Sequence, residues 1–299
     1  MGMKPQSFCQ MMWPGKAFWN RSIDRSAGPE LMGSLGIVTG TPSSAVEGSL
    51  LSSLEGVLFP KLVLHGNTRW VLPLAIYHRT NLRSGLSFCP LCMREGETYF
   101  RKTWRLSLFT SCQVHECELL DRCSRCTCPM QPHRIEMGNR SAYSNRPLYF
   151  CSNCDSDLRV GELKSVNKLL ALHEASFGRA MKYPNSGTLD SFSLLAHVLL
   201  LLTSQRPRLQ TFRRIVANEN RCSLIARWER DENSTIYFDG MSVSDRRSFL
   251  GTACWLLEDW PGKFVDIAQK SDLRNSDLTR DYKNAPAWYL QAVQNVGPH

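Results

Sequence analysis

Residues 89–126 read CPLCMREGETYFRKTWRLSLFTSCQVHECELLDRCSRC, and residues 151–154 add CSNC. This region contains four pairs of metal-type ligands, each with two residues between its members. The pairs are Cys89 and Cys92, Cys112 and His115, Cys123 and Cys126, and Cys151 and Cys154. Zinc requires four nitrogen or sulphur donors in a tetrahedron, and each pair supplies half of them. Four half-sites so close together predict two complete zinc sites.

The four half-sites can be grouped into two sites in two ways. Sequential pairing gives a first site of three cysteines and one histidine, and a second site of four cysteines. Interleaving would instead join the first half-site to the third. The spacing permits both groupings, and sequential pairing is the simpler choice. Three further residues are near enough to compete as ligands, namely Cys117, Cys128 and His133. The alternative for each spare thiol is an ordinary buried or surface cysteine.

The ligand sets also predict what the metals do. A catalytic zinc keeps three protein ligands and an open position, whereas both sets here close at four. Two structural Zn²⁺ ions are therefore expected. The sequence shows no His-x-Glu before a Cys-x2-Cys, which a nucleobase deaminase would need. No Ser/His/Asp set, carboxylate pair or phosphate-binding loop stands out either, so we expect a protein that is not an enzyme.

Composition and charge narrow the class of protein further. The 299 residues are 42% hydrophobic and 21% charged, which is typical of a soluble globular chain. The net charge of +9 favours a polyanionic partner, most commonly nucleic acid. The longest apolar run, Phe192–Leu202, is too short to span a bilayer and predicts a buried helix. With no signal peptide, the twelve cysteines are expected to be reduced and the protein cytoplasmic.

Outside the metal region the pattern is helical, so the predicted class is mainly α. We expect a helix-turn-helix-like region at 1–80, a double zinc-finger module at 81–160, and a helical C-terminal domain at 161–299. Pro29 begins one N-terminal helix, and Ser43 and Ser44 can cap a second one that runs through Leu54. The C-terminal helices are expected at 163–177, 189–202, 209–216, 244–257 and 263–268.

Arginines and lysines cluster beside the half-sites and again after residue 205. They are candidates for contacts with DNA phosphates, because such groups present charge and hydrogen-bond donors. Glutamates share the first stretch, so an ordinary solvated surface is an equal alternative there. The candidates are Arg101, Lys102, Arg105, Arg122, Arg125, Arg206, Arg208, Arg213 and Arg214.

The motifs described above resemble those of the TniQ family. The resemblance rests on the Cys-Pro-x-Cys, an aromatic and basic stretch with Trp104, the Cys-x2-His, a Leu-Leu step and the next Cys-x2-Cys. FWNRSIDR at 18–25 is similar to the stretch before the helix-turn-helix of that family. The resemblance covers residues 5–160 well, and the C-terminal half only in general character.

The resemblance implies a non-catalytic accessory protein of bacterial transposons. Such a protein helps to select target DNA, directly or through an RNA-guided complex, and recruits an AAA+ ATPase. The eight paired ligands would form its two zinc fingers. Family members usually begin with a further helix, so we expect the N-terminal unit to be incomplete. The alternative is a zinc-containing helix-turn-helix transcriptional regulator.

Overall fold

The computed structural model describes residues 5–16, 22–64, 66–74, 86–96, 99–134, 147–222, 224, 237–294 and 296–297. The chain forms two compact units, Met1–Val166 and Asn167–His299, which are described separately below. Within the described residues the structure consists of helices and isolated β-bridges, with no longer strand. The predicted mainly helical class is confirmed. The boundary predicted at residue 80 lies outside the described residues, and the three-part division stays a prediction.

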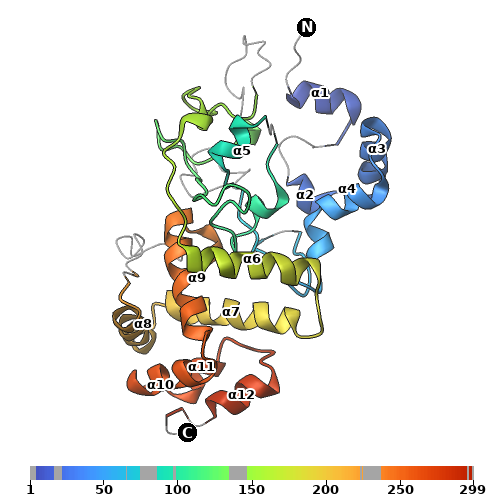
Figure 1. The fold of residues 1–299 in the computed structure, drawn as a ribbon. Helices are drawn as coiled ribbons and strands as arrows, with labels where there is room; N and C mark the ends of the chain where they lie inside the picture. Colours follow the sequence, from blue (N-terminus) through green and yellow to red (C-terminus); the bar gives the residue numbers. More distant parts are fainter. Residues whose placement is uncertain are drawn as a thin grey trace. The chain divides into compact units, whose positions relative to one another are not determined.

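The N-terminal unit contains short helices joined by long irregular segments (Figure 1). Its elements are α1 (Pro5–Met12), α2 (Ile23–Ser26), α3 (Pro29–Thr39), α4 (Ser43–Ser49), η1 (Leu51–Leu54), α5 (Pro90–Arg94), η2 (Lys102–Arg105), η3 (Pro132–Arg134) and η4 (Leu158–Val160). Within it, single bridges such as Phe88 with Leu120 and Val71 with Leu106 join distant segments. Residues 18–21 of the FWNRSIDR segment lie outside the described residues, and α2 follows them.

Helices α3 and α4 form the pair that the N-terminal pattern predicts. Pro29 is the first residue of α3, and Gly40 ends it in the left-handed conformation, with a φ of 65°. The two helices contact each other across a turn of three residues. No residue of α3 is buried, and Ile37 is 85% exposed. A helical pair is therefore present, but its use as a DNA-reading helix-turn-helix stays a prediction.

The second helix of this pair differs in detail from the expectation. Ser43 and Ser44 were expected to cap it, but they are its first two residues and no side chain caps the helix. The helix also ends at Ser49, and Leu50 is extended before η1 continues. Gly48 and Ser49 are poor helix formers, and the Ser49 hydroxyl donates to the Val46 carbonyl oxygen at 2.6 Å.

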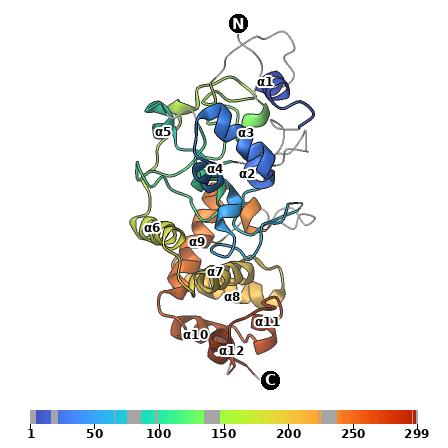
Figure 2. The same ribbon diagram turned by 90° about the vertical axis from the view of Figure 1, so that its right-hand side faces the viewer.

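The C-terminal unit packs its helices around one apolar element. It contains α6 (Lys168–Lys182), α7 (Thr188–Thr203), α8 (Pro207–Glu219), η6 (Phe238–Gly240), α9 (Val243–Leu257), α10 (Gly262–Lys270), α11 (Asn275–Thr279) and α12 (Ala287–Val293). Helix α7 carries the long apolar run and is largely buried, as predicted. Helix α9 crosses α6 and α7 and contacts both (Figure 1), and α10 packs on α8 (Figure 2). No helix in the described part of the chain has the length and apolar character that crossing a membrane requires.

The start of helix α6 differs from the one that the sequence pattern predicts. Helix α6 begins at Lys168 rather than at residue 163, because the Asn167 side chain accepts from the amides of Leu169 and Leu170.

Inside α7, His197 is buried among aromatic rings. Its Nε2 lies 2.7 Å from the Leu278 carbonyl oxygen and 3.0 Å from the Tyr289 hydroxyl. A histidine in an apolar helix here has a packing role.

Candidate metal centres

Three of the four half-sites adopt the same tight turn, at residues 112–117, 123–128 and 151–156. We call these the knuckle turns. In each, the amide of the first ligand donates to the carbonyl five residues on, at 2.8, 3.0 and 2.9 Å. The amide that follows the second ligand donates back to the first ligand's carbonyl, at 3.0, 2.9 and 3.1 Å. A short antiparallel bridge flanks every turn. The two-residue spacing thus produces one repeated backbone geometry.

The knuckle turns also hold a costly backbone conformation at one shared position. The residue after the second ligand has a positive φ in each turn: 48° at Glu116, 57° at Thr127 and 58° at Asp155. For residues other than glycine this conformation costs about 1–2 kcal/mol. Such strain persists only where the surroundings determine it, typically at binding sites. Three repetitions at equivalent positions therefore indicate turns shaped to present two ligand atoms each.

The remaining half-site uses a helix start instead of a knuckle turn. Cys89 is the N-cap residue of α5, Pro90 is the first helical residue, and Cys92 follows in the first turn. Proline is suited to that place because its fixed φ is helical and it has no amide hydrogen to leave unpaired. Both thiols consequently lie at the same end of α5, and both are fully buried.

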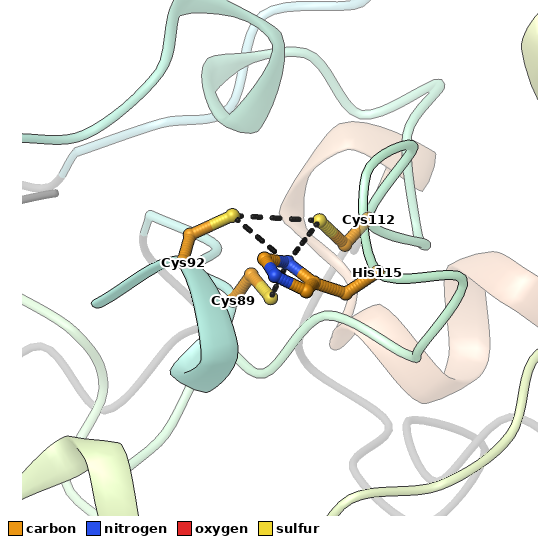
Figure 3. Close-up of side chains that lie close together, drawn as sticks. All are labelled: Cys89, Cys92, Cys112 and His115. Atoms are coloured by element: carbon orange, nitrogen blue, oxygen red, sulfur yellow. Dashed lines mark hydrogen bonds between the residues drawn. The ribbon is translucent and has the colours of Figure 1, made fainter. Parts of the chain in front are cut away.

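The first quartet consists of Cys89, Cys92, Cys112 and His115, whose ligand atoms all lie within 4.8 Å of one another. Figure 3 shows the three sulphur atoms arranged around the imidazole ring. The His115 Nδ1 lies 3.6, 3.3 and 3.6 Å from the sulphurs of Cys89, Cys92 and Cys112, respectively. The Cys92 and Cys112 sulphurs are 3.6 Å apart.

The second quartet consists of Cys123, Cys126, Cys151 and Cys154, again with all ligand atoms within 4.8 Å. The Cys123 and Cys154 sulphurs are 3.7 Å apart, and those of Cys126 and Cys151 are 3.6 Å apart. Both quartets follow the sequential grouping rather than the interleaved one. The structure thus brings together all eight predicted ligands, four in each cluster.

These separations can be compared with the geometry of zinc. Zn–S bonds of about 2.3 Å and Zn–N bonds of about 2.0–2.1 Å at tetrahedral angles place ligand atoms about 3.6–3.8 Å apart. The separations of 3.3–3.7 Å given above are close to those values. Thiolate and imidazole donors are also the set that zinc prefers. Each quartet can therefore hold one tetrahedral metal ion.

The pKa values of the thiols also favour a bound cation. Without a cation, burial raises the pKa of Cys92 to about 12, and it raises the pKa of Cys151 to about 12 as well. Such thiols keep their protons at neutral pH unless a positive charge is present. A divalent ion supplies that charge and displaces the protons. In the second quartet the hydrogen bond from the Ser156 hydroxyl lowers the pKa of Cys154 to about 6.

His115 has a supporting partner that the sequence pattern did not reveal. Its Nε2, on the far side of the ring from the sulphurs, lies 3.0 Å from the Glu95 carboxylate. This contact raises the pKa of His115. It also fixes the ring so that Nδ1 faces the three sulphurs. A carboxylate behind a ligand histidine commonly orients the ring at metal sites. Glu95 is the residue that ends α5, three places after Cys92.

The three spare candidates lie outside the quartets. Cys117 is nearest, with its sulphur 3.6 Å from that of Cys89, but it does not belong to the cluster of four. Cys128 lies at the end of its knuckle turn. His133 is buried, and burial followed by the nearby Arg134 lowers its pKa to about 4. It joins neither cluster.

The two quartets belong to one packed module. Helix α5 of the first quartet contacts η4, which follows the last ligand of the second. The Arg94 side chain donates to the Arg159 carbonyl oxygen at 2.6 Å. Gly161 fits this contact closely, because a Cβ atom there would lie 2.8 Å from a Leu120 methyl carbon and 3.4 Å from the Pro90 ring. The chain around one quartet thus supports the other.

Two basic residues near the first quartet form hydrogen bonds within the N-terminal unit. Arg105 is buried and donates to Asp24 at 2.6 Å, to the Ser22 hydroxyl at 2.9 Å and to the Leu72 carbonyl oxygen. Lys102 donates to the carbonyl oxygen of Gly48 at 2.6 Å and to the hydroxyl of Ser53 at 3.0 Å. These contacts give both side chains a structural role and speak against phosphate binding by Arg105.

The basic cluster of α8 is similarly engaged. Arg206 pairs with Asp281, and Arg208 lies 3.3 Å from Asp277. Arg213 is buried and donates to the Leu202 carbonyl oxygen at 3.3 Å. Opposite charges are therefore supplied within the unit, from segments some 70 residues away along the chain.

The remaining candidates are more accessible. Arg101 lies 6.0 Å from the ring centre of Trp104, and Arg122 donates to the Thr127 carbonyl oxygen at 3.0 Å. Arg125, at the tip of a knuckle turn in the second quartet, and Arg214, on α8, are exposed. Of the nine basic candidates these two are the best placed for an external partner.

The metal content of the purified protein tests the two quartets directly. Mass spectrometry of protein prepared with zinc should give about two ions per chain, because each quartet offers a complete tetrahedron. Cys92→Ser or Cys126→Ser should lower the content to about one. Cys128→Ser is the matched control and should leave it at two. Loss of an ion in the control, or retention of two in both ligand variants, would contradict the assignment.

The Glu95 contact makes a separate prediction. Glu95→Gln should weaken zinc binding at the first quartet by about 10–100-fold, because the ring loses the charge that orients it. Competition with a chromophoric chelator measures this affinity. Glu116→Gln, which changes the exposed carboxylate directly after His115, is the control and should have little effect. Equal affinities in the two variants would show that Glu95 does not support the site.

Comparison with known families adds one finding to this geometry. The TniQ family model matches residues 1–119. No curated protein and no solved structure matches the chain. The match includes the whole first quartet and ends before the second quartet begins at Cys123. The predicted resemblance to the TniQ family is therefore confirmed over residues 1–119.

Proposed function

We propose that this chain is a non-catalytic accessory protein of transposition. In this proposal the N-terminal unit binds two structural zinc ions, and the chain helps to select target DNA and recruits an AAA+ ATPase. The observation that carries the proposal is the TniQ match, which contains one complete metal-ligand quartet. A cytoplasmic location stays a prediction from the sequence.

The geometry of the quartets supports a structural role for the metals. All eight ligand atoms come from the chain, so each tetrahedron closes without a position for water or substrate. The three cysteines of the first quartet are buried, as are two of the second. Thiolate-rich, closed sites stabilise folds and do not activate water. The proposed chemistry is therefore limited to holding the N-terminal unit together.

The charge of the protein supports contact with DNA. The chain carries a net charge of +9, and exposed arginines bind phosphates through several donors. We assign this contact to Arg125 and Arg214, which are exposed, with Arg101 and Arg122 beside the metal region as further contributors. Arg105 and Arg213 are left out because they are buried. The DNA that contacts these groups is target DNA, either free or within an RNA-guided complex.

A second candidate function is a zinc-containing, helix-turn-helix transcriptional regulator. The observation that favours it is the contact between α3 and α4 around a short turn, in a helical pair whose first helix has no buried residue. A regulator would bind one fixed DNA sequence far more tightly than random duplex. It would also have no need of an ATPase partner. Transposase and AAA+ ATPase genes beside this one would favour the accessory protein instead.

A binding experiment with the zinc-loaded protein tests the DNA contact. The protein should shift duplex DNA at low salt, and its affinity should fall steeply as salt rises. Arg125→Ala or Arg214→Ala should each reduce the slope of log affinity against log salt by about 1, because one phosphate contact is lost. Arg280→Ala, an exposed arginine outside the candidate set, is the matched control.

Partner binding tests the rest of the proposal. The purified protein should bind the AAA+ ATPase encoded next to it, in the presence of ATP and DNA. If the protein neither shifts duplex DNA nor binds that ATPase, the accessory function is wrong. If it binds a fixed operator sequence and no ATPase, the regulator is the better account.

A further inference from the structure

The knuckle turns place one more side chain at an equivalent position. Counting from the first ligand of each turn, the fifth residue on is Cys117, Cys128 or Ser156. Its carbonyl accepts the amide hydrogen of the first ligand in every turn. Two of the turns, at 112–117 and 151–156, supply the second half of a quartet. We refer to Cys117 and Ser156 as the fifth-position residues.

In the second quartet the fifth-position residue bridges the two half-sites. The Ser156 hydroxyl oxygen lies 3.0 Å from the Cys123 sulphur and 3.2 Å from the Cys154 sulphur. A metal-bound thiolate has no proton to give, so the hydroxyl must be the donor in this contact.

In the first quartet Cys117 has the same relation to its facing half-site. Its sulphur lies 3.6 Å from that of Cys89, and both side chains are buried. Cys89 and Cys123 are the opening cysteines of their quartets. In both sites, therefore, the fifth residue of the closing turn contacts the opening cysteine. This shared geometry explains the position of Cys117 without making it a ligand.

The net charge of a quartet with a bound metal ion explains why these contacts would be stabilising. Three thiolates with one neutral imidazole around Zn²⁺ leave a net charge of −1, and four thiolates leave −2. Buried negative charge is costly unless hydrogen-bond donors meet it. A donor beside a ligand sulphur spreads this charge and fixes the side chain in the ligating rotamer, as supporting residues do at other metal sites.

We propose that Ser156 and Cys117 are positioning residues that each donate a hydrogen bond to the opening cysteine of a metal quartet. The inference rests on the metal binding proposed above. It assigns a common function to one position of the knuckle turn. In this proposal Cys117 donates through its S–H group and is not a fifth ligand. The effect on metal affinity is expected to be about 10–100-fold, as for other supporting residues.

Cobalt(II) titration of the full-length protein tests the second quartet. Cobalt reports on its own ligands through its visible and near-ultraviolet absorption, and chelator competition gives the affinity. Ser156→Ala should weaken binding at the four-cysteine site by about 10–100-fold and shift its thiolate-to-metal band. Ser156→Thr keeps the hydroxyl and should restore both. Ser124→Ala, an exposed serine at the tip of a facing knuckle turn, is the control.

The first quartet provides an independent comparison. Cys117→Ser keeps a donor and should bind cobalt as the wild type does, with the spectrum of a site with three thiolates and one imidazole. Cys117→Ala removes the donor and should weaken binding. If Cys117 were a ligand, both variants would lose a thiolate and their spectra would change alike, which would overturn the proposal.

The outcomes separate this inference from the proposed metal binding. A wild-type protein that takes up no cobalt would contradict the metal sites themselves. A wild type with two sites, in which Ser156→Ala and Cys117→Ala change neither affinity nor spectrum, would overturn only the positioning roles. If Ser156→Ala does not fold, as judged by circular dichroism, Ser156→Gly removes the same donor in its place. Unchanged affinity in that variant would also overturn the proposal.

Discussion

The N-terminal unit depends on gathering eight ligand atoms into two clusters. Neutral thiols gain little from such close contact, and thiolates whose sulphur atoms lie 3.6–3.7 Å apart repel each other unless a cation lies between them. The strained residues after three of the half-sites add to the cost. The zinc ion proposed for each quartet would offset these terms, since structural sites in small zinc domains contribute on the order of 10 kcal/mol. The same ion would also stabilise the turns around it.

This constraint accounts for the different construction of the two units. In the N-terminal unit, bulky side chains such as Trp70, Trp104 and Phe88 are buried among segments that are joined by single bridges rather than by a sheet. The contact of α5 with η4 links the two quartets, so that each supports the packing of the other. In the C-terminal unit the apolar helix α7 supplies a core of the usual kind. Hydrophobic burial is the main stabilising feature of that unit, whereas the proposed metal ions would stabilise the first.

The sequence predicted those features that depend on local spacing. The two-residue gaps identified all eight residues that the structure gathers into the two quartets, and the apolar run that begins at Phe192 predicted a buried helix. It could not predict contacts between distant segments. Arg105 was predicted to contact DNA because the sequence does not reveal its partner, Asp24, which lies 81 residues earlier in the chain. Glu95 and Ser156 were missed because only the fold shows what a carboxylate or hydroxyl faces. The start of α6 was misplaced because the Asn167 cap outweighs an apolar pattern.

Hydrogen exchange measured before and after chelation tests the central claim most directly. If the metal quartets hold the N-terminal unit together, removing zinc should abolish amide protection through residues 86–134 and 147–166. Helices α6 to α10 of the C-terminal unit should then keep their protection, because burial of apolar surface stabilises them. Protection that survives throughout the N-terminal unit after complete zinc removal would contradict this account.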